Sequence, residues 1–209
     1  EEQVAKMLER INQLGFLEAI HPELKWDGWL RDKVVSLVKG EFNDHWDFTE
    51  NNHLSIRRDL IYILWLLRMP YGHAQSVTSR LKFSATLVRM ILSARKLWKH
   101  LDELVEAAPS VVVEKLEDAS QLVLLAVYHA SERQEIRKVL DQYVSKWRYI
   151  SPSVDGHDLR KRGIPPGPIY KAILRQLRSS WLDGDIQNVD QENELIEHII
   201  QEIGRSKIK

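Results

Sequence analysis

The sequence predicts an all-α fold, and three observations agree on this. Apolar residues recur three and four positions apart along most of the 209 residues, which is the spacing of one helix face. Glycine and proline fall mainly between these periodic segments. No segment shows a convincing strand-like alternation of apolar and polar residues. We therefore expect a body of about seven helices, then a smaller helical tail, with no sheet and no internal repeat.

The N-terminal part predicts two amphipathic helices and a loop. Residues 2–14 have helical periodicity and end before Gly15, a residue suited to a helix C-cap. Residues 26–38 form a second amphipathic segment. The polar residues 41–52 that follow predict a loop whose aromatic residues, Trp46 among them, are buried.

The most hydrophobic helix is expected at residues 54–69, where it ends at Pro70 because proline cannot continue a helix. We expect this segment to form the centre of the core. The residues expected there are Leu60, Ile61, Ile63, Leu64 and Leu67.

A helix pair follows at residues 73–81 and 84–101. The longer helix has an apolar stripe made of Leu87, Ile91, Ala94, Trp98 and Leu101. Its cations lie roughly opposite that stripe: Arg89, Lys96 and Lys99, with Lys82 in line if the helix extends back. No acidic residue stands between Asp59 and Asp102. Such a ridge without acids is explained either by contacts with phosphates or by ordinary solvation.

Three more helices are expected at residues 111–117, 119–130 and 132–149, stacked on the core. Their inward residues are expected to be Leu122, Leu125, Ile136, Leu140 and Trp147. Residues 151–153, Ser-Pro-Ser, are the clearest linker, so we predict domains at 1–150 and 151–209. A final acidic helix is expected at residues 190–203.

Composition restricts the class of protein. The net charge is zero, with 30 basic and 30 acidic residues, but the charges are segregated along the chain, which is compatible with one basic surface. There is no cysteine, which excludes disulfides and thiolate metal sites. The longest apolar run, residues 60–67, is too short to cross a membrane. Because the chain begins Glu1-Glu2 without methionine, we expect it to be a piece of a longer polypeptide.

A second candidate site surrounds a proline-rich turn, Gly-Ile-Pro-Pro-Gly-Pro, at residues 163–168. Pro168 suits the first position of a helix, and the amides of Ile169 and Tyr170 would then have no partner within that helix. Such a helix start binds anions readily. Six basic residues and two acidic ones lie between residues 155 and 181. A phosphate contact and a plain solvated helix face are both consistent with this pattern.

The residues around this turn resemble a known family. Gly-x-Asp-Leu at 156–159, the turn at 163–168, Ile-Leu at 173–174 and Leu-Asp-Gly at 182–184 occur in this order. The pattern resembles the C-terminal region of class II tRNA nucleotidyltransferases, the CCA-adding enzymes, a class shared with bacterial poly(A) polymerases. The resemblance is close over about 30 residues and looser over the preceding helices, which are similar to the family's neck and body.

The resemblance implies a function. The body and tail would hold the acceptor and T-arm of tRNA through phosphates, and an N-terminal head of the same polypeptide, absent here, would use Mg²⁺ to add nucleotides. No cofactor is expected in this chain, no membrane partner is expected, and the location would be cytoplasmic. The candidate RNA-binding residues are Arg80, Lys82, Arg89, Lys96, Lys99, Arg160, Lys161, Arg162, Gly163, Gly167, Ile169, Tyr170, Lys171, Arg175 and Arg178.

No catalytic or metal-binding residue is predicted. Asp183 and Asp185 offer a carboxylate pair, but Gly184 between them predicts a helix end. His157-Asp158 lacks further ligands at suitable spacing, so Asp158 is expected to support the turn by accepting backbone hydrogen bonds. Two alternatives stay open: a helix-hairpin-helix type module that binds DNA, and an all-α scaffold whose acidic last helix docks a protein.

Overall fold

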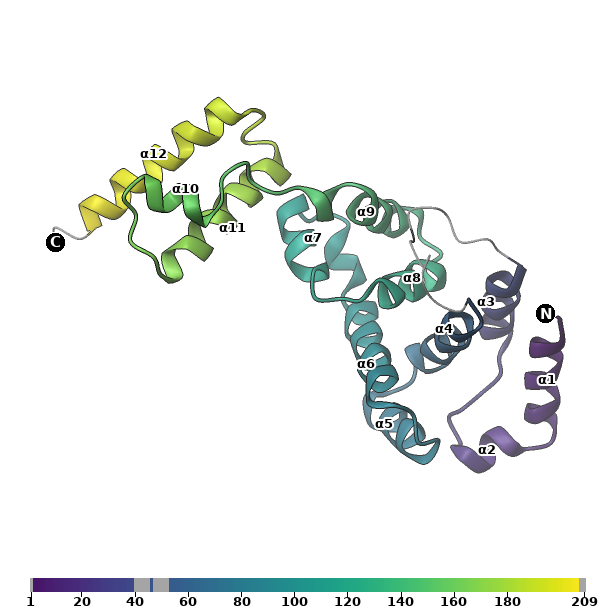
Figure 1. Cartoon of the computed structure of the whole chain (residues 1–209). Helices are drawn as coiled ribbons and strands as arrows, with labels where there is room; N and C mark the ends of the chain where they lie inside the picture. The colour runs from purple at the N-terminus through teal and green to yellow at the C-terminus, as the bar shows by residue number, and fades with distance from the viewer. Residues whose placement is uncertain (1, 40–45, 47–52, 207–209) are drawn as a thin grey trace. The chain divides into compact units, whose positions relative to one another are not determined.

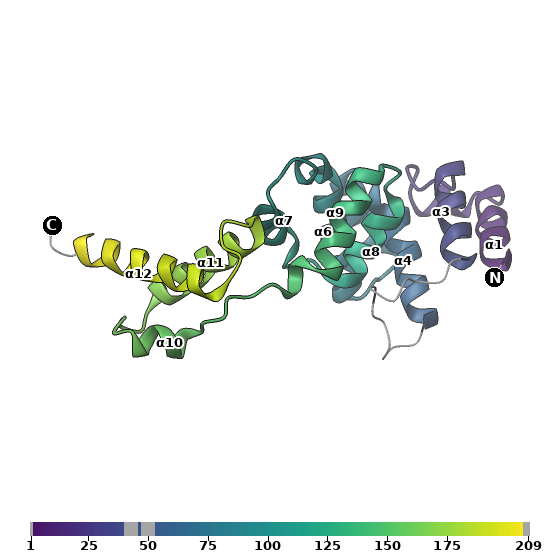
Figure 2. The same ribbon diagram turned by 90° about the horizontal axis from the view of Figure 1, so that it is seen from above.

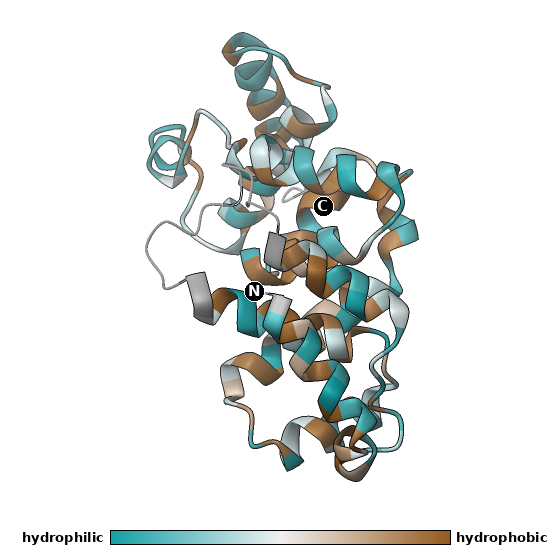
Figure 3. Cartoon of the chain, turned by 90° about the vertical axis from the view of Figure 1, so that its right-hand side faces the viewer, coloured by the Kyte–Doolittle hydropathy of each residue, from teal (hydrophilic) through white to brown (hydrophobic). Residues whose placement is uncertain are grey.

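The computed structural model describes residues 2–39, 46 and 53–206, and it confirms the all-α fold. Within these residues the chain forms twelve α-helices and two short 3-10 helices, with no strand (Figure 1). Most helices have apolar residues on one side and polar residues on the other (Figure 3). No helix in this part of the chain is long and apolar enough to span a membrane.

The chain divides into two compact units. The first contains Glu1–Glu106 and Leu116–Asp141, and the second contains Ala107–Lys115 and Gln142–Lys209. The helices of the first are α1 (Glu2–Gln13), α2 (Phe16–Ile20), α3 (Gly28–Lys39), α4 (His53–Leu67), α5 (Tyr71–Arg80), α6 (Ala85–Lys99), the 3-10 helix η1 (Leu101–Leu104), α8 (Gln121–Ala130) and the greater part of α9 (Gln134–Ser145).

Helix α4 is central to the first unit, as its hydrophobicity predicts. It packs against α6 and α8, which also pack against each other. Of the five residues predicted for the core centre, Ile61 is half-buried and the other four are buried: Leu60, Ile63, Leu64 and Leu67. Burying each such side chain contributes about 1.5–3 kcal/mol. This three-helix core fixes the direction in which α6 presents its opposite face.

Some predicted helix boundaries are wrong. Helix α3 begins at Gly28 and not at residue 26, because the Asp27 carboxylate caps it by accepting the Leu30 amide at 2.9 Å. The single helix predicted at 132–149 is interrupted at Lys146, whose φ of −134° is not helical. The predicted loop at 41–52 lies outside the described residues except for Trp46, which is buried as expected.

The second unit contains a helical tail with its own core. Its helices are α7 (Pro109–Leu116), the 3-10 helix η2 (Trp147–Tyr149), α10 (Gly156–Lys161), α11 (Pro168–Asp183) and α12 (Val189–Ser206). Helix α11 packs against α10 and α12 (Figure 2). The core cluster consists of Leu159, Ile164, Ile173, Leu177, Ile196 and Ile199. The predicted last helix is thus present. Helix α10 was not predicted from the sequence. The domain boundary proposed at 150–151 stays a prediction.

Candidate nucleic-acid interface

Helices α5 and α6 form a helix–turn–helix whose short turn is held by the backbone. The amide of Phe83 donates to the carbonyl oxygen of Thr78 at 3.1 Å, and Lys82 takes a left-handed φ of 52°. Ser84 then caps α6, its side chain accepting the Leu87 amide at 3.2 Å. This cap fixes where α6 begins, and therefore which of its residues face away from the core.

Five cations lie along this pair and are called the basic ridge: Arg80, Lys82, Arg89, Lys96 and Lys99. All five side chains are exposed, whereas the opposite face of α6 is buried through Leu87, Ile91 and Ala94. No carboxylate among the described residues forms an ion pair with a ridge cation. Arg89 makes only a long contact of 3.5 Å with the Thr86 hydroxyl. The ridge therefore presents positive charge to solvent, and its binding to RNA stays a prediction.

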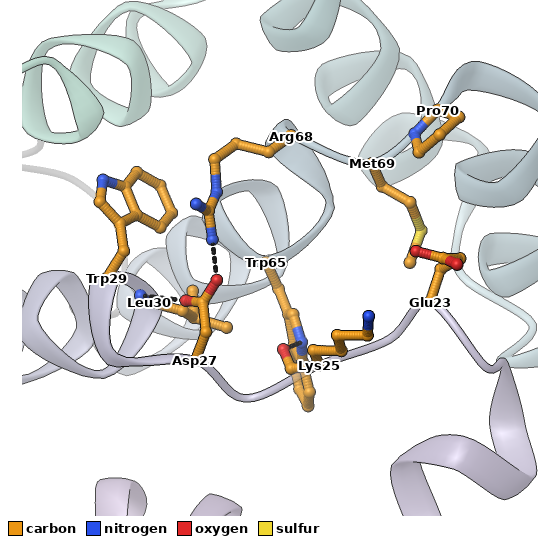
Figure 4. A pocket seen from close by; sticks show the side chains of 9 residues that line it. All are labelled: Glu23, Lys25, Asp27, Trp29, Leu30, Trp65, Arg68, Met69 and Pro70. Carbon is orange, nitrogen blue, oxygen red and sulfur yellow. Dashed lines mark hydrogen bonds and ion pairs between the residues drawn. The ribbon is translucent and has the colours of Figure 1, made fainter.

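The other two cations of the acid-free span are used inside the protein. Arg95 donates to the carbonyl oxygen of Leu66 at 2.9 Å, and burial lowers the pKa of Arg95. Arg68 lies 4.1 Å from the ring centre of Trp29 and forms an ion pair with Asp27 (Figure 4). Both cations thus stabilise the first unit, which separates them from the ridge.

Arg68 and Asp27 line a small pocket of about 130 Å³. Partial burial acts to raise the pKa of Asp27, but the Leu30 amide and Arg68 outweigh it, so the pKa lies below its usual value. Figure 4 shows the two charged groups pointing at each other. A carboxylate that is ionised and already paired in this way is poorly suited to proton transfer, so we assign no catalytic role to the pocket.

The proline turn positions the start of α11. Gly167 precedes Pro168 with an extended backbone, φ 164°, and its exposed Cα faces open space. The Tyr170 amide, predicted to have no partner within the helix, donates to the carbonyl oxygen of the N-cap residue Gly167 at 3.0 Å. This hydrogen bond joins residues three apart, so the first turn of α11 has the tighter 3-10 pattern. The anion site predicted at this helix start is correspondingly weaker.

Tyr170 and two glycines fix the shape of the turn. The Tyr170 hydroxyl donates to the carbonyl oxygen of Ile164 at 2.8 Å. A Cβ added to Gly156 would lie 3.2 Å from the Tyr170 ring, so α10 approaches that ring closely because residue 156 has no side chain. Gly163 has a φ of 82°, which favours glycine. The sequence analysis gave Gly156 no packing role, because it did not predict the helix α10 that begins there.

Two of the predicted RNA-binding arginines hold the tail together. Arg162 donates to Glu197 at 2.8 Å and to Asn193 at 2.5 Å, which ties α10 to α12. Arg178 donates through Nε to the carbonyl oxygen of Ile150 at 2.9 Å. Both side chains are only partly exposed. Their positive charge is used within the second unit, which reduces what they can offer to a ligand.

Of the remaining predicted cations of the tail, some are paired and some are not. Arg175 forms an ion pair with Glu114 of α7, and Lys161 pairs with Asp158 at 3.2 Å. Asp158 also accepts the Asp155 amide, so it does accept a backbone hydrogen bond as predicted, but at the start of α10 and not in the proline turn; these contacts lower the pKa of Asp158. The tail cations that are exposed and unpaired among the described residues are Arg160 and Lys171.

Asp183 has a structural role. Its carboxylate accepts the Ser110 amide at 2.8 Å and the Ser110 hydroxyl at 2.6 Å, next to the first residue of α7. Gly184 ends α11 with a φ of 83°, as its sequence position predicts. Within the described residues, no three or more His, Asp or Glu side chains gather in a way that could hold a metal ion.

Asp183→Ala should therefore destabilise the second unit by about 0.5–2 kcal/mol, the usual cost of losing a helix cap. The Ser110 amide and hydroxyl both lose their acceptor. Denaturant unfolding followed by circular dichroism measures the loss, and Asp185→Ala, at an exposed position just after α11, is the control. Equal stability of the two variants would contradict a capping role for Asp183.

No protein-family model matches the chain. Two A-adding tRNA nucleotidyltransferases are similar in part: 36% identity over 64 residues for that of Halalkalibacterium halodurans, and 34% over 77 residues for that of Geobacter sulfurreducens. These matches cover 31% and 37% of this chain but only 15% and 9% of the two relatives. They confirm the family resemblance seen in the sequence.

The fold matches solved CCA-adding enzymes over nearly the whole chain. The Thermotoga maritima CCA-adding enzyme complexed with tRNA-CCA aligns with a TM-score of 0.69 and 17% identity over 94% of this chain. An apo form of a CCA-adding enzyme aligns with the same score over 95%. The chain spans 47% and 46% of these two proteins. At this identity the likeness shows a shared fold, and it covers about half of the larger protein.

Proposed function

The chain resembles A-adding tRNA nucleotidyltransferases in part of its sequence and CCA-adding enzymes in its fold. We propose that it is the RNA-binding part of a tRNA nucleotidyltransferase. In this proposal the body and tail hold tRNA through its phosphates. Nucleotide addition takes place in a catalytic head outside these residues, where carboxylates bind Mg²⁺. The relatives that match in sequence are A-adding enzymes. CCA addition, A addition and poly(A) synthesis would differ in that head, not in the part proposed here.

The basic ridge is the observation that carries this proposal. Double-helical RNA has a deep, narrow major groove, so proteins recognise it mainly by shape and by contacts with phosphates and 2′-hydroxyls. Cations that are exposed and have no acidic partner meet that requirement without having to break internal ion pairs. The five ridge residues fulfil both conditions, and they belong to a fold shared with an enzyme solved in complex with tRNA.

The tail adds a smaller set of contacts to this proposal. Arg160 precedes and Lys171 follows the exposed residues 165–167 in the sequence, and both side chains are exposed and can approach a phosphate. Gly167 lets a sugar–phosphate backbone come close to the main chain. Arg162, Arg175 and Arg178 would act mainly by keeping α10–α12 in place, because each already has a partner inside the unit.

Fluorescence anisotropy with labelled tRNA tests the proposal. The chain should bind tRNA, and the logarithm of its binding constant should fall linearly with the logarithm of salt concentration. Duplex DNA of equal length is the comparison. Tighter binding to DNA would favour a helix-hairpin-helix type module, whereas no binding to either nucleic acid would favour a protein-interaction scaffold.

Gly167→Ala separates binding from folding at the proline turn. The extended backbone accepts any residue, and an added Cβ meets nothing within 4 Å, so the melting temperature should stay unchanged. The affinity for tRNA should fall several-fold, because the methyl group keeps the RNA backbone away. Gly28→Ala, also at the first turn of a helix and also in open space, is the matched control in binding and melting experiments. Undiminished tRNA binding would remove the turn from the interface.

A further inference from the structure

A second pocket of about 230 Å³ lies in the first unit between α3 and the end of α8, and none of its lining residues belongs to α5 or α6. Lys33, His129, Glu132 and Arg137 are among the residues that line it. Pockets for drug-sized ligands usually measure about 300–1,000 Å³, so this one suits a smaller molecule. The charges of its walls indicate what kind of molecule that is.

Lys33 carries a largely buried charge in the pocket. Its side chain is only 12% exposed, and its ion pair is a loose one, 3.5 Å from Glu132, whose own side chain is 74% exposed. A buried ammonium group is costly unless a counter-charge and hydrogen bonds compensate it. The Lys33 ammonium also lies 5.9 Å from the ring centre of Trp29, which offers only a weak interaction at that distance. Lys33 is therefore incompletely compensated.

Arg137 adds a second cation to the same wall. Its Nε donates to the carbonyl oxygen of Ser131 at 2.9 Å, and its guanidinium carbon lies 5.7 Å from the ring centre of Tyr128. These contacts fix the side chain but use only one N–H group. Its two terminal nitrogens have no hydrogen-bond partner among the described residues. A guanidinium held in this way offers a fork of donors that matches an oxyanion.

The charges of Lys33 and Arg137 both act on a third residue of the pocket, His129. Its Nε2 lies 3.3 Å from the carbonyl oxygen of Lys33, which can only accept, so this nitrogen carries the proton. Burial lowers the pKa of His129; the hydrogen bond to the Lys33 carbonyl acts against this, and the positive charges of Lys33 and Arg137 add to the lowering. Near pH 7 the imidazole is thus neutral, and two cations line the pocket with it. The buried part of the pocket has a net positive charge.

The acidic residues of the pocket lie at its rim. Asp32 is 75% exposed and sits 3.6 Å from Arg31, and Glu132 is exposed to a similar degree. Solvent screens such exposed charges far more than buried ones. Glu132 is therefore a weak, replaceable counter-ion for Lys33.

From this arrangement we propose that the pocket binds a phosphate group between Lys33 and Arg137, as inorganic phosphate or as the phosphate of a mononucleotide. The bound oxyanion displaces Glu132 from Lys33 and accepts hydrogen bonds from the guanidinium of Arg137. This site is distinct from the basic ridge, and the proposal does not depend on binding of tRNA.

Isothermal titration of the intact chain with sodium phosphate and with AMP, at constant ionic strength set with chloride, tests the site. We expect saturable binding with one site per chain, and a shift of the His129 ring signals in NMR spectra during the same titration. Tighter binding of AMP than of phosphate would identify a nucleotide as the ligand, and equal binding would identify phosphate itself. A linear, non-saturating response to both would overturn the proposal.

Two substitutions act in opposite directions. Lys33→Met should weaken phosphate binding at least about tenfold, which is 1.4 kcal/mol, while the unliganded protein stays folded because a buried charge is removed. Glu132→Gln should tighten binding, since the internal competitor for Lys33 is lost. Lys138→Met, an exposed cation next to Arg137, is the control and should change nothing. If Lys33→Met does not fold, Glu132→Gln decides, and unchanged binding in that variant would overturn the proposal.

Discussion

Replacing Arg89, Lys96 and Lys99 together by glutamine should lower the affinity for tRNA by more than about tenfold and reduce its salt dependence. Each phosphate contact that is lost removes about one unit from the slope of log K against log salt, so the slope should fall by about three. All three side chains are exposed and have no ion pair, so their removal costs the folded state little. The melting temperature should therefore stay nearly unchanged.

The control for this variant removes the same charge elsewhere in the first unit. Arg31, Arg58 and Lys138 are also exposed, and they lie outside the ridge. Their joint change to glutamine should leave the salt slope nearly as it is in the original chain. If both triple variants lose affinity equally, net charge and not the ridge determines binding. If the ridge variant melts early, its cations have a structural role that the structure does not explain.

Glu192→Ala should destabilise the second unit by about 1–3 kcal/mol, because it removes the acceptor of the Ser153 amide and hydroxyl. Glu192 is fully buried. Its carboxylate accepts the Ser153 amide at 3.0 Å and the Ser153 hydroxyl at 2.6 Å, which joins the linker before α10 to the start of α12. Without the carboxylate, residues 151–153 lose their anchor, and their amides should exchange hydrogen faster.

Hydrogen exchange followed by mass spectrometry, together with calorimetric melting, measures both effects. Glu194→Ala changes an exposed acid two residues further along α12 and should have almost no effect. Ser153→Ala removes only the hydroxyl and should show a smaller loss than Glu192→Ala. Unaltered exchange at residues 151–153 in the Glu192 variant would mean that the linker is held by something else.

The periodicity of the sequence was sufficient for the fold class and for the orientation of single helices. Leu60, Ile63 and Leu64 are buried, and the ridge cations are exposed, because a helix with one apolar side has to turn that side inward. The end of α11 at Gly184 also followed from local chemistry, since a glycine accepts the left-handed conformation that ends a helix. Each of these features depends on residues within a few turns of one another.

The partners of charged side chains were not predictable in this way. Arg162, Arg175 and Arg178 have the composition and spacing of a basic helix face, yet each meets an acceptor from another segment. The sequence predicts a linker at residues 151–153 but not that Glu192, 39 residues further on, fixes it. Spacing along one helix says nothing about which other segment covers its polar side.

The sequence by itself therefore determined an all-α chain, the apolar side of each long helix and an acid-free row of cations. Only the tertiary structure decided which cations remain available to a ligand, because an ion pair or a hydrogen bond between distant residues depends on how the segments pack. That packing leaves the ridge exposed, draws the tail arginines into internal contacts, and brings Lys33 and Arg137 together beside His129.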